Sequence, residues 1–128
     1  MNQKYFLILF LGITQLLSAQ KITYKIPDSL RSKDYEYLDD KIYELKKDSS
    51  KAAVYMYAYL NKARNEHNWK EMVNAYQGLL HQSPDNLRLV YADSMIYSAK
   101  KSNDDALIGS AYLSKGIVYY GQKKQIMA

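Results

Sequence analysis

The side chains that could support catalysis or bind a metal ion are few and far apart in this sequence of 128 residues. There is no cysteine, which excludes disulfides, thiolate metal sites and cysteine nucleophiles. The two histidines, His67 and His81, lie fourteen residues apart and do not have the His-Glu-x-x-His spacing of a zinc site. We therefore expect no metal site, no cofactor, and an exposed loop position for His67.

The acidic pairs and one serine–lysine pair have simpler explanations than catalysis. Asp104-Asp105 is typical of the start of a helix, where carboxylates accept hydrogen bonds from free backbone N–H groups. Asp39-Asp40 lies in another segment and points elsewhere. Ser18 and Lys21 have the Ser-x-x-Lys spacing of some acyl-enzymes, but they flank an expected cleavage site. Since no nucleophile, base and orienting group come together, we expect the chain not to be an enzyme.

Charge and glycine usage also exclude phosphate and nucleic-acid binding by this segment. The five glycines are isolated, so no glycine-rich phosphate loop is present. The net charge is +5, but the basic pairs at 46–47, 100–101 and 123–124 are spread along the chain. Lysines at helix C-termini complement the helix dipole, and a nucleic-acid site would need them clustered on one face.

The first nineteen residues have the order of an export signal. Lys4 precedes an apolar run over 5–17, and the small residues Ser18 and Ala19 follow it. The run is about 13 residues long, short of the roughly 20 that span a bilayer. We expect residues 1–19 to be a signal peptide cleaved after Ala19, which places the mature chain in the periplasm or cell envelope. The alternative is that this segment forms a buried first helix.

The rest of the chain reads as a row of helices. Two prolines and five glycines leave few turns. Pro27 favours an extended lead-in over 20–33, and apolar residues at intervals of three and four predict helices over about 34–47, 50–66, 69–82, 87–101 and 105–120. We expect Gly121 to end the fifth helix and residues 122–128 to open a sixth. Short loops make successive helices antiparallel neighbours.

Small residues suggest a repeat within this row. Ala92, Ile96 and Ala99 have the small–large–small spacing of a helix that packs closely, and Gly116, Tyr119 and Ala128 suggest a further pair. Ala92 and Ala128 lie 36 residues apart, close to the period of about 34 in tetratricopeptide repeats. Ala58-Tyr59-Leu60 also matches Ala111-Tyr112-Leu113 at an offset of 53, which does not fit that period. No small residue is evident as the anchor of the first unit.

The region from Asp34 to Ala128 resembles tetratricopeptide-repeat proteins on these residues. With the export signal, Tyr91-Ala92-Asp93-Ser94 and the segment 116–120, it is similar to the exported sensory region of flavobacterial AraC-type helix-turn-helix regulators. The resemblance implies an all-α fold of antiparallel helix pairs stacked as a short α-solenoid. It also implies a membrane helix and a DNA-binding domain beyond Ala128, so that membrane tethering depends on a part absent here and the chain is cut within its last repeat. An unrelated five-helix bundle remains the alternative.

A solenoid of this kind binds partners along the face formed by the first helix of each pair. In the register above, this face carries side chains of the third and fifth helices, which are our candidate binding residues: Asn74, Gln77, His81, Ser110, Leu113, Ile117 and Tyr120. We expect a protein, a peptide or a second copy of the chain as the partner. The alternatives are a structural adaptor of an envelope complex, and a small secreted hydrolase or metal-binding protein that uses the two histidines.

Overall fold

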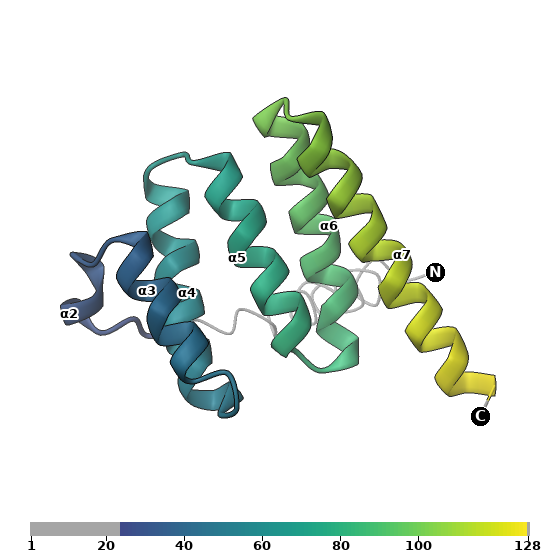
Figure 1. The fold of residues 1–128 in the computed structure, drawn as a ribbon, viewed down its shortest axis with the longest axis horizontal. Helices are drawn as coiled ribbons and strands as arrows, with labels where there is room; N and C mark the ends of the chain where they lie inside the picture. Colours follow the sequence, from purple (N-terminus) through teal and green to yellow (C-terminus); the bar gives the residue numbers. More distant parts are fainter. Residues whose placement is uncertain (1–23, 128) are drawn as a thin grey trace, which may run out of the picture.

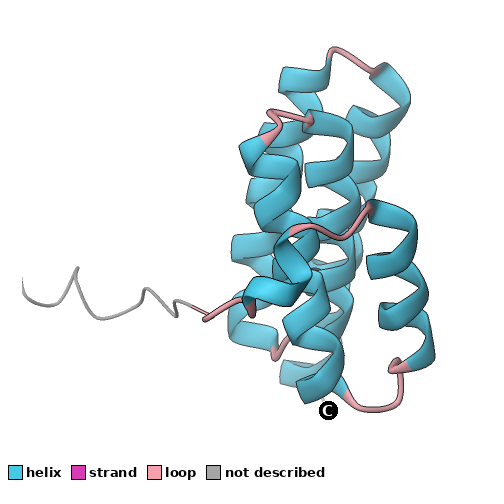
Figure 2. Cartoon of the chain, turned by 90° about the vertical axis from the view of Figure 1, so that its left-hand side faces the viewer, coloured by secondary structure: helices cyan, strands magenta, loops and turns pink. Residues whose placement is uncertain are grey.

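The computed structural model describes residues 24–127, and the expected signal peptide over 1–19 lies outside this range. Within it the chain folds as helices joined by loops, and an all-α fold is confirmed (Figures 1 and 2). The helices are α2 (Asp28–Arg31), α3 (Tyr35–Glu44), α4 (Ser49–Asn65), α5 (Trp69–Gln82), α6 (Asp85–Ser102) and α7 (Asp105–Met127). Of these described helices, none is both long enough and apolar enough to cross a bilayer.

The longer helices lie side by side in chain order (Figure 1). Each of α3 to α7 packs against the helix that follows it, and α7 also contacts α5 across one end of α6. The short helix α2 packs only on α4. Because the connections are short, the chain reverses direction at each one, as expected from the loop lengths.

Side-chain caps define where four of the helices begin. Asp34, Asp48 and Asn68 each accept a hydrogen bond from the backbone N–H three residues further on, as expected of helix N-caps. Asp104 accepts from the N–H groups of both Ala106 and Leu107, which confirms its capping role. The caps of α3, α5 and α7 therefore stand at residues 34, 68 and 104, at intervals of 34 and 36.

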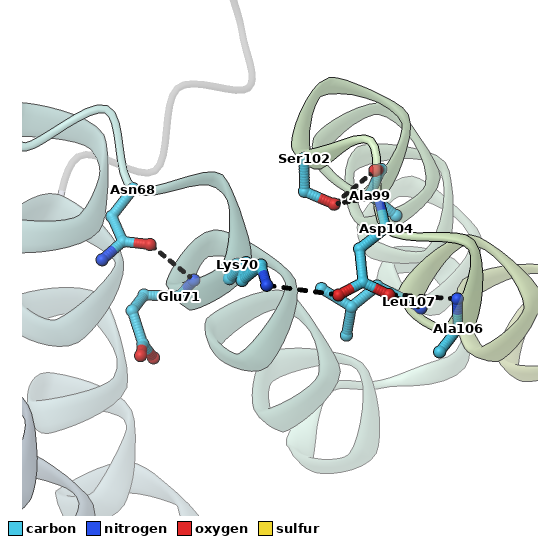
Figure 3. A network of polar contacts seen from close by, with 8 residues as sticks. All are labelled: Asn68, Lys70, Glu71, Ala99, Ser102, Asp104, Ala106 and Leu107. Carbon is cyan, nitrogen blue, oxygen red and sulfur yellow. Dashed lines mark hydrogen bonds and ion pairs between the residues drawn. The ribbon is translucent and has the colours of Figure 1, made fainter.

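The loop between α6 and α7 is fixed to the start of α5 (Figure 3). Asn103 ends α6 in the left-handed conformation, with φ 53°, a role that asparagine tolerates well. Ser102 Oγ donates to the Ala99 carbonyl and accepts from the Asp104 N–H, and the Asp104 carboxylate pairs with Lys70 Nζ at 3.3 Å. This ion pair links the first turns of α5 and α7, two helices that also touch along their length.

The core is a continuous layer centred on α4 and α5. Leu38, Met56, Val73 and Met95 are among its most buried side chains, and Trp69 and Ile96 pack against it while partly exposed. A smaller cluster beside it joins three helices through Leu80 of α5, Ala92 of α6 and Val118 of α7. The inward faces predicted for α4, α5 and α6 are therefore confirmed.

Two local predictions are wrong. Residues 28–31 form one helical turn within the expected extended lead-in, because buried Leu30 packs with its N–H bonded to the Pro27 carbonyl. Gly121 does not end the fifth helix, since α7 continues to Met127, and no glycine in the described range has a positive φ. Glycine inside a helix costs only about 1 kcal/mol relative to alanine, which is less than the helical hydrogen bonds on both sides provide. The expected sixth helix over 122–127 is thus the last part of α7, and Ala128 lies outside the described residues.

The small residues fall into two groups. Ala92 and Ala99 are completely buried, so their predicted packing role is confirmed. Gly116 and Tyr119 are exposed, and a Cβ built on Gly116 would meet no atom within 4 Å, so these two make no close contact within residues 24–127. The first unit does have a small buried residue, Ala58, which stands 34 residues before Ala92 and was missed because we aligned it with Ala111.

A candidate binding groove between the last three helices

The largest opening that three helices share lies where α5, α6 and α7 meet. It encloses about 290 Å³ and is lined by Gln77, Leu80 and His81 of α5, Asp85 and Arg88 of α6, and Ser110, Leu113, Ser114, Ile117, Val118, Gly121, Gln122 and Gln125 of α7. The long α7 provides one whole wall. We call this opening the α5–α7 groove.

The floor of the groove is apolar and fixed. Leu80 and Val118 are buried there against Ala92, so this part of the floor belongs to the packed interior. Above them Leu113 and Ile117 form an exposed rim, with 67% and 60% of their surface accessible. The groove thus offers apolar surface at two depths, which suits a ligand that has apolar side chains of its own.

Polar groups of α6 hold one end of the groove in shape. The Arg88 guanidinium donates from Nε to the Ser83 carbonyl at 3.1 Å and pairs through Nη1 with Asp85 at 3.3 Å. Gln122 Nε2 reaches across from α7 and donates to the Asp85 carbonyl at 3.2 Å. The start of α6 and the last turns of α7 are therefore tied together.

A second tie holds the middle of α7 against α6. Lys115 Nζ donates to Asp93 Oδ1 at 2.6 Å. This hydrogen bond, with the attraction between the two charges, raises the pKa of Lys115 above its usual value. The pair is exposed, so its value lies in orienting α7 rather than in net stability.

The remaining polar side chains of the groove are free to meet a ligand. Among the hydrogen bonds between described residues, none uses the side chain of Gln77, His81, Ser110 or Ser114, although each of them lines the groove. Amide and hydroxyl groups both donate and accept, as the N–H and C=O groups of a peptide backbone require. These residues do not include an activated nucleophile, so the arrangement suits binding.

The structure brings five of the seven predicted binding residues together: Gln77, His81, Ser110, Leu113 and Ile117. Asn74 instead faces a separate small cavity beside α3, where its Nδ2 donates to Glu71 Oε2 at 3.0 Å. Tyr120 is 70% exposed on α7 and does not line the groove. The sequence could place the helices, but not the rotation of each helix about its own axis.

Sequence reasoning missed the groove residues of α6 and of the last turns of α7. Asp85 and Arg88 were overlooked because a binding face built only from the first helix of each pair leaves out the second helix. Gln122 and Gln125 were overlooked because we expected Gly121 to end the helix. Their signal was present, since residues 114, 118, 122 and 125 repeat at intervals of four and three.

The two histidines lie in different surroundings. His67 is exposed in the α4–α5 loop with a positive φ of 51°, as expected of a loop position, whereas His81 lines the groove. Across residues 24–127 no three histidine or acidic side chains gather in a way that could hold a metal ion. No protein-family model, curated protein or solved structure matches the chain.

Proposed function

We propose that this chain is a non-catalytic interaction module that binds a protein or peptide segment in the α5–α7 groove. The observation that carries the proposal is the groove itself, in which unpaired amide and hydroxyl groups stand around a buried apolar floor. An extended peptide matches this pattern, because its backbone needs polar partners at regular intervals and its side chains supply the apolar contacts.

The helices further support a tetratricopeptide-like solenoid as the scaffold of this module. Equivalent caps recur at intervals of 34 and 36 residues. Tyr57 and Tyr91, also 34 residues apart, meet at equivalent positions of α4 and α6, where their hydroxyls are 2.6 Å apart in a hydrogen bond. Buried Ala58 and Ala92 follow directly after them. In this register α3, α5 and α7 are the first helices of successive pairs, so the groove lies on the inner face of the array.

We also propose that the module is exported and belongs to a membrane-tethered transcriptional regulator of the AraC type. This rests on the signal-like order of residues 1–19 and on the family resemblance, neither of which involves the described residues. The gene should then continue past Ala128 with further helix pairs, about 20 apolar residues and a basic helix-turn-helix domain. A reading frame that stops at Ala128 contradicts the regulator proposal and leaves the groove proposal untouched.

The groove is tested by selecting binders from a display library of random twelve-residue peptides. Ser110→Arg puts a long charged side chain into the groove from half-exposed Ser110 and should weaken every selected peptide by about tenfold or more. The matched control is Ser94→Arg, which makes the same change on α6 outside the groove and should leave affinity within about twofold. Titration calorimetry measures both. Equal weakening by the two variants, or none by Ser110→Arg, would refute the groove as the site.

A further inference from the structure

The outward face of α7 is apolar and uncovered over most of its length. Its large exposed side chains are Tyr112, Leu113, Ile117, Tyr119, Tyr120, Ile126 and Met127. Leu113, Tyr120 and Met127 lie at intervals of seven, so they share one line along the helix, opposite buried Ala111 and Val118. Surface of this kind marks an interaction site when it is contiguous.

Two glycines lie between these side chains on the same line. Gly109 and Gly116 are exposed, and a Cβ on either would meet nothing within 4 Å, so no contact within residues 24–127 requires glycine there. Glycine weakens a helix interior, and at both positions it leaves a hollow beside a large apolar side chain. The sequence of this face along α7 is therefore small, large, small, large at 109, 113, 116 and 120.

This pattern is complementary to itself when two copies of α7 run in opposite directions. A two-fold axis between residues 114 and 115 sets Tyr120 of each copy over Gly109 of the other, and Leu113 over Gly116. Large residues then enter the hollows that the glycines leave, which allows helix axes to approach to about 8 Å. Tyr112 and Ile117, on the two edges of the face, also meet in this register.

The charges at the two ends of α7 fit the same register. Asp105 stands in the first turn and Lys124 near the last, and the same axis places each opposite the other in the second copy. Neither side chain has an ion-pair partner among the described residues. An antiparallel pair therefore joins opposite charges at both ends and also sets the helix dipoles head to tail, whereas a parallel pair would place like charges together.

We propose that the outward face of α7 is the interface of a two-fold symmetric homodimer in which the two α7 helices pack antiparallel about an axis between residues 114 and 115. Such an interface is isologous, so a single patch serves both copies. The dimer does not depend on the α5–α7 groove being a peptide site, although Leu113 and Ile117 stand at the edge of both surfaces.

Sedimentation equilibrium of the purified chain over a wide concentration range tests the proposal. Wild type should show a monomer–dimer equilibrium. Lys124→Glu and Asp105→Lys should each weaken dimerisation at least tenfold, because each puts like charges at both ends of the pair. An equimolar mixture of the two variants should recover it, since every end of the mixed dimer is then complementary. The matched control Lys47→Glu makes the same charge change at an exposed site on the loop after α3 and should dimerise like wild type.

Helicity and thermal melting of each variant separate a lost interface from a lost fold. A wild-type chain that stays monomeric at every concentration would assign the α7 face to another occupant and overturn the proposal. Dimers that the single variants do not weaken, or that the mixture does not restore, would place the contact elsewhere and overturn it equally. Because peptide affinity in the groove is measured with Ser110→Arg, failure of the dimer and failure of the groove give different results.

Discussion

Two small residues on neighbouring helices should respond in opposite ways to enlargement. Ala92 of α6 is completely buried between Leu80 and Val118, whereas Gly116 of α7 has open space where its side chain would be. Ala92→Leu forces three more carbon atoms into the contact that joins α5, α6 and α7. Gly116→Ala adds one methyl group and removes the helix-weakening freedom of glycine.

The magnitudes follow from packing and helix propensity. Overpacking a filled core costs about 1–3 kcal/mol, and in a domain of this size this lowers Tm by roughly 5–20 °C. Replacing a helical glycine that makes no contact by alanine should stabilise the monomer by about 0.5–1 kcal/mol. The two variants should thus move the urea midpoint in opposite directions at a protein concentration too low for dimers.

The assay can use the single tryptophan. Trp69 is half buried, and its ring lies 6.1 Å from that of Tyr97 between centroids, so its fluorescence reports on the contact between α5 and α6. Circular dichroism at 222 nm reports on all the helices together. If Ala92→Leu is as stable as wild type, or if Gly116→Ala is destabilised, the packing described for α7 is wrong.

Other parts of the fold give further expectations. Tyr57→Phe and Tyr91→Phe each remove one hydroxyl of the hydrogen bond between α4 and α6 and should each cost about 1 kcal/mol, with the double variant costing clearly less than the sum in a urea-melt cycle; full additivity would show that the hydroxyls do not interact. Asp104 accepts backbone hydrogen bonds from Leu107 and Ala106 and pairs with Lys70, which holds its pKa below the ordinary 3.8. Because the folded carboxylate releases its proton more readily than the unfolded one, its contribution to stability is present above about pH 4 and is lost as pH falls through the lowered pKa. In Asp104→Asn, melts at falling pH should therefore show a shallower loss of Tm than wild type, and equal slopes would contradict this.

The sequence was sufficient for the helices because their boundaries are local. The capping side chains Asp48 and Asp104 and the turn residues Ser83-Pro84 stop or start helices through contacts a few residues away. The predicted α5 matches the structure at both ends. Periodicity then gave the buried faces, including Ala92 and Ala99.

What the sequence did not determine depends on contacts between distant residues. Gly121 could have ended a helix or continued one, and the local sequence does not decide between them, whereas the bond from Gln122 to Asp85 favours continuation. Asn74 and Gln77 are both polar and one turn apart, yet only Gln77 lines the groove, because the tilt of α7 determines which turn of α5 it covers. The Tyr57–Tyr91 bond reveals the 34-residue period more clearly than any single identity in the sequence does.

The arrangement of α3 to α7 in chain order also has a kinetic consequence. Almost every contact in the core joins a helix to the next one or the next but one, so few distant segments must find each other during folding. Low contact order of this kind corresponds to folding in microseconds to milliseconds. It also lets a row of helices open from its ends. Backbone amides of α7 should therefore exchange with deuterium sooner than those of α5, which has neighbours on both sides.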